Sequence, residues 1–291
     1  MIVIVKLGGA AITNKKGICE LTSEKNITRL LDQVAEAYVH LKTAGHQLIL
    51  IHGAGSFGHP QAVQYQLKTG WSADRLPSPD YLKGYAHIRT CLQSLVHTVS
   101  SDLERRQVPV LAMSPTDYII TDDGEETSTD RFGPMIDRIQ QYLRLGFVPL
   151  LHGDAVLDRV RGCTVLSGDV IMYQLAKAMV NVSRCVFITD VAGIYQHDPK
   201  VVYPQQGENP LVPHIVVSQH SDQPITSAST VADVTGGMQG KIRWAKRIVS
   251  EVGAKRKMEV VICRWGTEEA LAMMSLEQDR RAGAKMTVFT L

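Results

Sequence analysis

Cysteine is scarce in this chain and follows no pairing pattern. The five residues never take the CxxC spacing and are widely dispersed: Cys19, Cys91, Cys163, Cys185 and Cys263. An odd number of scattered cysteines argues against a disulfide framework and against a zinc site. We therefore expect reduced thiols in a cytoplasmic protein, and no metal ligands among the side chains.

Charge of one sign and long apolar runs are also lacking. The formal net charge is only +2, with no basic tract, which argues against a nucleic-acid or membrane-surface partner. No apolar run reaches the roughly 18 residues that a membrane helix needs. The opening MIVIVKLGG is too short for a signal segment and is interpreted as a strand. Any positive field for an anionic ligand must therefore be local.

Short β-branched runs alternate with amphipathic stretches along the chain. The order predicts an α/β fold with a mainly parallel sheet and helices on both faces, which binds its ligands at the carboxyl ends of the strands. A soft boundary near residue 180 would divide an acceptor-binding part, 1–180, from a nucleotide-binding part, 181–291, within one continuous domain. Strands are expected at 2–5, 47–51, 108–113, 147–151, 183–189, 258–263 and 285–289, and helices at 24–44, 80–106, 130–145, 169–180, 237–252 and 268–275.

Two glycine-rich segments follow strands in the first half. Lys6 ends the first strand and precedes Gly8 and Gly9, and the second strand runs into HGAGSFGH, residues 52–59. Glycines allow backbone N–H groups to approach an anion because no Cβ intervenes, and a following helix adds a favourable dipole. Each segment could also be a plain turn. The match to G-x-G-x-x-G permits a dinucleotide site, which is disfavoured because the motif follows the second strand rather than the first.

The two histidines that bracket the second segment are expected to differ. His52 directly follows an apolar strand and is interpreted as structural, hydrogen-bonded to the backbone. His59 lies past the turn at the start of a helix, where it can donate to an anionic oxygen. The alternative for His59 is a helix-cap histidine.

Polar residues also follow strands in the second half. Asp169 opens a helix, so its carboxylate either caps that helix or orders lysine ammonium groups. The segment from Asp190 to Tyr195 suits a nucleoside or forms a plain turn. DVTGGMQGK, residues 233–241, opens a helix and places Lys241 one turn in, which suits a second phosphate site. No Walker A sequence is present.

Two anion-binding segments with lysines, on different strands, suit two phosphates that meet head to head. Through these segments the sequence resembles the amino-acid kinase family, and within it the isopentenyl phosphate kinases. HGAGSFGH is the most specific, because the histidine at position 59 is typical of the branch whose acceptors carry a phosphate or phosphonate. The resemblance covers essentially the whole chain and rests on KLGGAAIT, HGAGSFGH, PLLHGDAVLD, LSGDVI, FITDVAGIY and DVTGGMQGK, in that order.

The resemblance implies a three-layer αβα sandwich and a role for each site residue. The catalytic residues would be those at the transferring phosphate: Lys6, Lys15, His59, Asp169 and Lys241. The acceptor phosphate would be held by Gly53, Ala54, Gly55 and His59, with Gly153 nearby. The nucleotide would contact Lys6, Gly8, Gly9, Lys15, Asp190, Gly193, Tyr195, Gly237, Met238 and Lys241. Ala10 stands where many family members have serine, and Lys16 beside Lys15 leaves the register of that lysine open.

The implied activity is in-line transfer of the γ-phosphoryl group of ATP, with Mg²⁺, to isopentenyl phosphate. The product would be isopentenyl diphosphate, an isoprenoid precursor in a mevalonate-type pathway, made by a cytoplasmic homodimer. A phosphate monoester, with a second pKa near ~6, is already largely anionic and needs no strong general base. The alternatives are a phosphonate kinase of the fosfomycin-resistance type, a carboxylate kinase, a nucleotide-sensing protein without catalysis and a dinucleotide-binding oxidoreductase.

Overall fold

The computed structural model describes residues 1–71, 76–196, 209–218, 236–277 and 283–291. Among these, no helix is both long and apolar enough to cross a membrane. The described helices are α1 (Gly9–Ile12), α2 (Glu24–Thr43), α3 (His59–Gln64), α4 (Pro79–Arg105), α5 (Gly133–Arg144), α6 (Gly168–Ala178), α7 (Gly236–Ile248) and α8 (Glu268–Met274). The described strands are β1 (Ile2–Leu7), β2 (Gln47–His52), β3 (Val110–Ala112), β4 (Ile120–Thr121), β5 (Val148–His152), β6 (Asp154–Asp158), β7 (Gly162–Leu166), β8 (Val182–Thr189), β9 (Ile194–Tyr195), β10 (Leu211–Val212), β11 (His214–Val216), β12 (Glu259–Arg264) and β13 (Met286–Thr290).

One large sheet runs through the molecule in the order β11-β13-β12-β8-β1-β2-β5-β3. Every pairing in it is parallel except that of β12 with β13. The predicted mainly parallel sheet is therefore confirmed. β8 and β1 are neighbours, so strands from the first half of the chain lie on one side of this junction and strands from the second half on the other.

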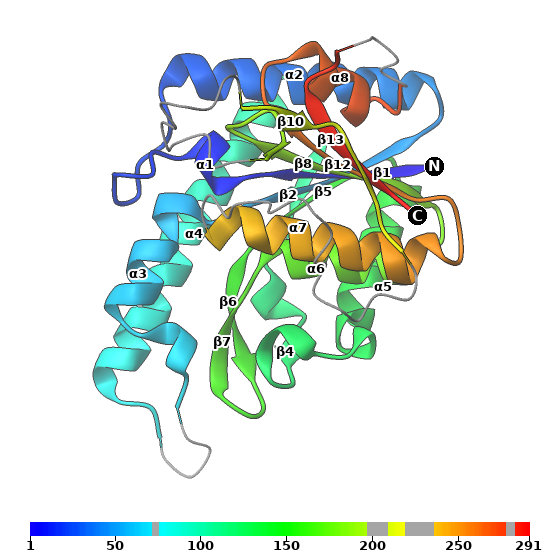
Figure 1. Ribbon diagram of the computed structural model, residues 1–291. Helices are drawn as coiled ribbons and strands as arrows, with labels where there is room; N and C mark the ends of the chain where they lie inside the picture. The colour runs from blue at the N-terminus through cyan, green and yellow to red at the C-terminus, as the bar shows by residue number, and fades with distance from the viewer. Residues whose placement is uncertain (72–75, 197–208, 219–235, 278–282) are drawn as a thin grey trace.

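Helices cover both faces of the sheet (Figure 1), so a central strand such as β1 is buried on both sides. Ile2 and Ile4 of β1 pack in one core with residues of α5, α6 and α7. Val3, Val5 and Leu7 alternate to the other face and pack with residues of α2, α4 and α8. This period-2 alternation produces the expected three-layer αβα sandwich. It also directs Lys6 toward the face of α6 and α7.

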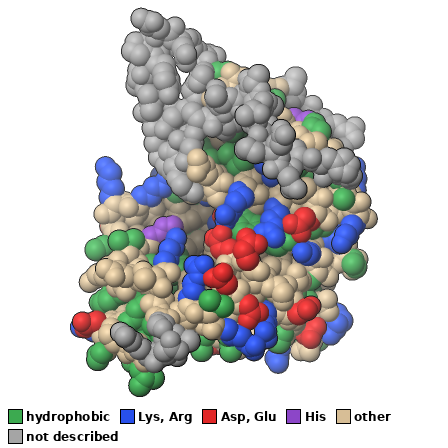
Figure 2. Space-filling view, turned by 60° about the horizontal axis from the view of Figure 1, so that its bottom comes forward, with side chains coloured by type: hydrophobic (Ala, Val, Ile, Leu, Met, Phe, Trp, Pro, Cys, Tyr) green, Lys and Arg blue, Asp and Glu red, His purple; other side chains and the backbone are tan. Residues whose placement is uncertain are grey.

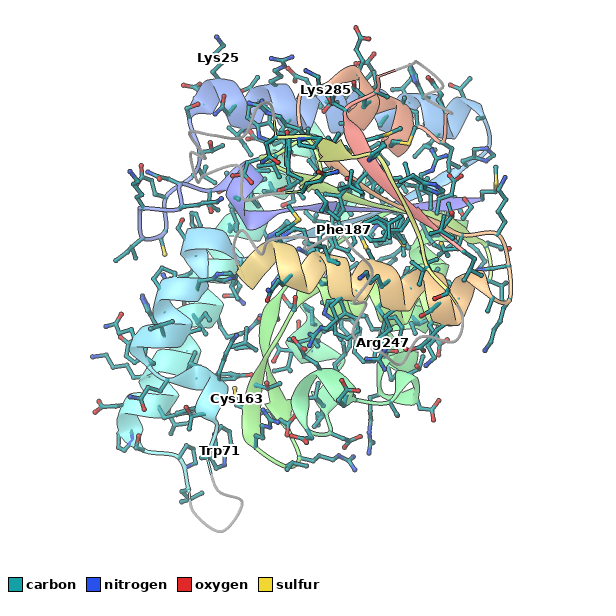
Figure 3. The ribbon with its side chains drawn as sticks, in the orientation of Figure 1. Lys25, Trp71, Cys163, Phe187, Arg247 and Lys285 are labelled. Atoms are coloured by element: carbon teal, nitrogen blue, oxygen red, sulfur yellow. The ribbon has the colours of Figure 1, made fainter. Side chains whose placement is uncertain are left out.

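A smaller lobe extends below the sheet in Figure 1 and consists of α3, the start of α4 and the β6–β7 hairpin. The hairpin, with β4 beside it, forms a three-stranded sheet that the sequence did not predict. Trp71 lies on the hairpin (Figure 3), where its backbone N–H donates to the Arg161 carbonyl at 2.8 Å. Its ring packs edge-on against Tyr81, with the ring centroids 5.3 Å apart. The apolar side chains that fill the lobe are Ala62, Leu67, Tyr81, Ile88, Leu92, Ala155 and Cys163.

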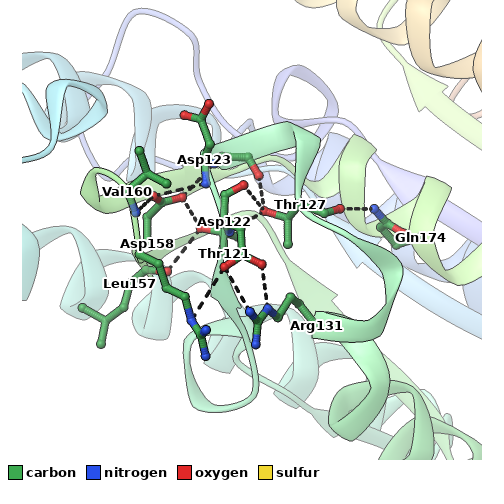
Figure 4. A network of polar contacts seen from close by, with 11 residues as sticks. Thr121, Asp122, Asp123, Thr127, Arg131, Leu157, Asp158, Val160 and Gln174 are labelled. Atoms are coloured by element: carbon green, nitrogen blue, oxygen red, sulfur yellow. Dashed lines mark hydrogen bonds and ion pairs between the residues drawn. The ribbon is translucent and has the colours of Figure 1, made fainter.

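The turn of this hairpin is fixed by the carboxylate of Asp158 (Figure 4). It accepts from the Thr121 hydroxyl at 2.6 Å and from the N–H groups of Gly124 at 2.7 Å and Arg161 at 2.8 Å. Burial raises the pKa of Asp158, but the hydrogen bonds outweigh it and lower the pKa to about 2. The network ties the hairpin to the segment before α5 and gives the lobe a rigid edge.

Candidate functional site

Lys6 and Asp169 form a buried ion pair at the carboxyl end of β1. Lys6 Nζ lies 2.6 Å from Asp169 Oδ1, and the side chains are only 7% and 10% exposed. The lysine stem passes over Gly168, where a Cβ would lie 3.0 Å from Lys6 Cε, and the ammonium lies 5.9 Å from the centroid of the Phe187 ring (Figure 3). The glycine before Asp169 therefore leaves room for the lysine that the aspartate holds.

The carboxylate of Asp169 does not cap its helix. Ser167 is the N-cap of α6, and its hydroxyl oxygen accepts the N–H of Asp169 at 3.2 Å. Because Ser167 caps the helix, the carboxylate of Asp169 is available to other partners. Of the two interpretations open from the sequence, the ordering of lysine ammonium groups is the one that the geometry supports.

Lys241 enters the same region from the first turns of α7. A Cβ on Gly240 would lie 3.8 Å from Asp169 Oδ2, and Lys241 Nζ donates to the Gly237 carbonyl at 3.0 Å. Burial and then the positive charge of Lys6 lower the pKa of Lys241 to about 8, against the opposing effect of Asp169. When both lysines are protonated, Lys6, Lys241 and Asp169 together carry one net positive charge, which an anion would neutralise.

His59 lies at the start of α3, as predicted, with its side chain exposed to solvent. Desolvation by the surrounding protein lowers the pKa of His59, and the charges of Lys68, Lys6 and Lys241 lower it further. Lys6 and Lys241 therefore act on the histidine from across the site. On the face shown in Figure 2, a histidine lies beside Lys or Arg side chains. Positive charge on the lysines of the first and fifth motifs therefore disfavours protonation of the histidine of the second motif.

Lys15 and Asp190 form an exposed ion pair, with Lys15 Nζ 2.8 Å from Asp190 Oδ2. Lys15 lies in the loop between α1 and α2, and Asp190 directly follows β8. Burial raises the pKa of Asp190, but the hydrogen bond from Lys15 and its charge outweigh burial and lower it. Of the two adjacent lysines, Lys15 is therefore the one that pairs with Asp190.

The glycines of the first two motifs let their backbones touch. A Cβ on Gly9 would lie 2.7 Å from Gly55 Cα, and a Cβ on Gly53 would lie 2.6 Å from Gly9 N. Gly55 also has a φ of +50°, in the left-handed region that favours glycine. No side chain fits between these loops, so the two motifs form one continuous backbone surface.

Three predicted glycines already use their N–H groups in the protein. They donate to carbonyl oxygens at the strand ends: Gly8 to Ile188 at 2.8 Å, Gly53 to Leu7 at 2.8 Å, and Gly153 to His52 at 3.2 Å. We expected such N–H groups to contact phosphate. These three instead bring neighbouring strand ends together, because each donor is committed.

The residues expected at the nucleoside lie on the β8 side of the sheet. Gly193 packs against β13, where a Cβ would lie 2.5 Å from Thr287 Oγ1, and Tyr195 is half-buried in β9. Met238 packs against the core beneath α7, and Gly237 is exposed. Residues 233–235 of the fifth motif lie outside the described residues.

The structural interpretation of His52 is confirmed. Its ring is fully buried, its Nδ1 lies 3.1 Å from the Gly53 carbonyl oxygen, and it stacks on His152 of β5 at 5.4 Å. Burial and then His152 lower the pKa of His52 to about 3, so the ring is neutral near pH 7. The two stacked rings lie at the ends of the adjacent strands β2 and β5.

A second buried ion pair behind the site was not predicted. Arg89 of α4 donates to both carboxylate oxygens of Asp154 at 2.6 Å, and Asp154 also accepts the N–H of Thr116 at 3.2 Å. The motif PLLHGDAVLD contains Asp154, but Arg89 lies 65 residues away in a helix. No spacing in the sequence indicates that Arg89 and Asp154 form a pair.

A parallel α/β sheet with cationic side chains and glycine-rich loops at its carboxyl edge defines a protein that binds phosphorylated ligands. The model of the amino acid kinase family matches residues 1–264. The chain belongs to the amino acid kinase family, and the predictions of the fold and of an ATP-dependent kinase are confirmed.

Several relatives carry a more specific name. The chain is 30% identical to the isopentenyl phosphate kinase of Arabidopsis thaliana, over 91% of this chain and 87% of the relative. It is also 30% identical to that of Methanothermobacter thermautotrophicus, over 83% and 84%. A solved structure of an isopentenyl phosphate kinase superposes with a TM-score of 0.73 at 25% identity and covers both chains fully. Glutamate 5-kinase of Geobacillus thermodenitrificans is 27% identical over 85% of this chain but only 59% of the relative.

Proposed function

We propose that the chain transfers the γ-phosphoryl group of ATP to isopentenyl phosphate and produces isopentenyl diphosphate. The observation that carries the proposal is geometric: the Lys6–Asp169 ion pair lies beside Gly240, the residue before Lys241. The loop after Lys6 also touches the glycine-rich loop that leads to His59. A carboxylate acceptor would not need His59. The names of the relatives that match over most of their length support the same acceptor.

The residues present fit a triphosphate. Lys6 is paired with Asp169, whereas burial and the charge of Lys6 lower the pKa of Lys241 to about 8. The ATP phosphates would supply negative charge beside Lys241. Among the described residues no group of three His, Cys, Asp or Glu side chains could hold a metal. Mg²⁺ would therefore enter with the nucleotide, held chiefly by phosphate oxygens, and would neutralise charge on the transferring group.

The two halves of the sheet would divide the substrates. In this assignment the acceptor lies over residues 1–180, where α3, α4 and the hairpin form the lobe, and the nucleotide lies over residues 181–291. Lys6 would stand between them, since β1 adjoins β8 at the junction of the two sets of strands. Lys15 would exchange Asp190 for a phosphate when the nucleotide binds.

The chemical task is to bring two polyanions together. Two unit charges about 4 Å apart repel by roughly 4 kcal/mol at an effective dielectric of 20, and each phosphate carries more than one charge. Lys6 and Lys241 would offset this repulsion as fixed point charges, with Asp169 holding Lys6 in place. His59 would donate a hydrogen bond to the acceptor phosphate and position it, rather than remove a proton, because the acceptor oxygen is already anionic.

The remaining assignments follow from the resemblance. We assign the enzyme to the cytoplasm and to the homodimeric state. Sedimentation of the purified chain measures that state directly.

The test is an ADP-release assay with ATP and Mg²⁺ on isopentenyl phosphate, dimethylallyl phosphate, fosfomycin and glutamate in parallel. We expect the highest kcat/KM with isopentenyl phosphate. A preference for fosfomycin would make the chain a phosphonate kinase, and a preference for glutamate would remove the role given to His59. Absence of ADP release with all four would leave a nucleotide-binding protein without this activity.

A further inference from the structure

The loop that carries Lys15 is a compact hairpin between α1 and α2. The N–H of Asn14 donates to the Glu20 carbonyl at 3.0 Å, and the N–H of Thr22 donates to the Ile12 carbonyl at 3.0 Å. Lys15 lies near the tip and Cys19 on the returning arm. Because these hydrogen bonds join the two arms of the loop, a movement of the arm that carries Cys19 would also move Lys15.

Ser56 fastens this loop to the second glycine motif. Its carbonyl accepts the N–H of Cys19 at 3.0 Å, and its hydroxyl donates to the Glu20 carbonyl at 2.8 Å. Its own N–H donates to Thr13 Oγ1 at 3.1 Å. A shift of the Cys19 arm would therefore be transmitted to the segment that ends at His59.

Gln61 of α3 lies beside one thiol of this loop and one thiol of α4. Gln61 Nε2 lies 3.1 Å from Cys19 Sγ and 3.8 Å from Cys91 Sγ, so one amide nitrogen lies beside both sulfur atoms. Cys19 is exposed, Cys91 is buried, and both are free thiols. Cys91 Sγ also lies 3.8 Å from His87 Nε2.

The conformation of Cys19 and the environment of Cys91 agree with this contact. Cys19 has a φ of +50°, which is uncommon for a residue with a Cβ and is held here by the hydrogen bonds of the loop. Burial and then a hydrogen bond with the Cys19 thiol raise the pKa of Cys91 to about 12. The exposed thiol is therefore the one that meets an oxidant first.

We propose that hydrogen peroxide converts Cys19 and Cys91 to a reversible disulfide, and that this bond lowers turnover by fixing the Lys15 loop to α4. Cytosolic disulfides are most often transient and redox-sensing, which suits a pair of free thiols beside a catalytic loop. The disulfide itself does not depend on the proposed function; its effect on turnover does.

The chemistry balances with peroxide as the oxidant. The Cys19 thiolate attacks one peroxide oxygen, the O–O bond breaks, and the departing hydroxide leaves as water with the thiol proton. The sulfur is then a sulfenic acid. Cys91 attacks that sulfur, the S–O bond breaks, and a second water leaves with the proton of Cys91. Two thiols lose two hydrogen atoms and one peroxide is reduced to two waters.

The disulfide would disturb the site through Gln61. An S–S bond of about 2.05 Å requires the two sulfur atoms beside Gln61 Nε2 to close on one another, so we expect the amide to shift. Gln61 is buried and its Nε2 also lies 3.4 Å from the Ser56 carbonyl oxygen. It stands two residues after His59 on α3. We therefore expect displacement at His59 and restraint at Lys15 together.

The experiment treats the full-length chain with a stepwise peroxide titration, followed by non-reducing peptide mapping and kcat measurement. We expect a cross-linked peptide that joins Cys19 to Cys91, lighter than the two separate peptides by two hydrogen atoms. We expect kcat to fall by about tenfold to 100-fold, since a displacement of ~1 Å can cost ~10²-fold. Dithiothreitol should restore both the free peptides and the turnover.

Matched variants separate this pair from other oxidation. Cys19→Ser and Cys91→Ala should keep full turnover through the same titration, whereas Cys163→Ala, which removes a buried thiol of the lobe, should respond like the wild type. Sulfinic acid at Cys19 without the cross-link would overturn the proposal. So would inhibition that persists in Cys19→Ser, or a cross-link that leaves kcat unchanged. If no acceptor is phosphorylated at all, the proposed function fails while the peptide map still tests the disulfide.

Discussion

Replacement of Asp169 by asparagine is the most informative single change. The ion pair with Lys6 is 2.6 Å long and buried, so at an effective dielectric of 20 its attraction is about 6 kcal/mol. Much of this offsets the desolvation of the two charges. Loss of one partner from a buried pair typically costs about 3–5 kcal/mol, because the other charge stays buried and uncompensated. We expect a loss of that size in the free energy of unfolding of Asp169→Asn.

The same change has a kinetic consequence through Lys241. Asp169 opposes the lowering of the pKa of Lys241 to about 8, so its removal lowers that pKa further. A larger fraction of Lys241 is then uncharged at neutral pH and cannot bind phosphate. We expect kcat/KM for ATP to fall by more than tenfold, with its alkaline limb shifted to lower pH.

Urea unfolding and a pH profile of kcat/KM measure the two effects. The double variant Lys6→Met with Asp169→Asn should recover part of the lost stability, because no isolated ammonium remains, but none of the activity. Glu259→Gln is the matched control, since it breaks the pair with Arg184, where Arg184 Nη2 lies 2.7 Å from Glu259 Oε2 at the opposite end of the sheet. It should lower stability and leave the pH profile unchanged. An Asp169→Asn protein as stable as the wild type, with the same alkaline limb, would refute the reasoning.

Three further outcomes test the site. His59→Ala should lower kcat/KM for isopentenyl phosphate by about 10- to 100-fold, the equivalent of one charged hydrogen bond of ~1.5–3 kcal/mol, while the KM for ATP stays the same. The control His46→Ala, at the other end of β2, should change neither value. An equal rise in both KM values in His59→Ala would contradict the assignment. The KM for ATP should rise as the pH passes upward through about 8, because the ammonium of Lys241 is present below this pKa and lost above it, whereas Lys241→Arg should keep its KM constant to higher pH. Lys15→Met should raise the KM for ATP and Lys16→Met should not, since only Lys15 pairs with Asp190; equal effects would remove Lys15 from the nucleotide site.

The large sheet was predictable because its signal is local. The alternation of β1 divides its side chains between two cores, and the 3.6-residue spacing of α2 buries one stripe that includes Leu30, Leu31 and Val34. The β6–β7 hairpin was missed. Its strands are five residues each, and β6 contains the polar Asp154 and Asp158, which are buried with partners distant in the sequence, Arg89 and Thr121.

The candidate site was predictable to the extent that strand ends meet at one edge of a parallel sheet. That rule predicts that Lys6, Asp169 and Lys241 lie at the same edge. It could not reveal that Ser167 releases Asp169 from capping, because both residues suit an N-cap. Nor could it pair Lys15 with Asp190, 175 residues apart, since only the folded chain brings them together.

In the proposed function, lysines and a histidine at one edge of the sheet bring two phosphates together for direct transfer. Phosphorus NMR of a reaction with ATP, Mg²⁺ and isopentenyl phosphate tests it most directly, because it identifies every phosphorylated product. We predict the coupled signals of isopentenyl diphosphate and ADP, appearing in equal amounts. Inorganic phosphate with ADP, and no new diphosphate, would contradict the account.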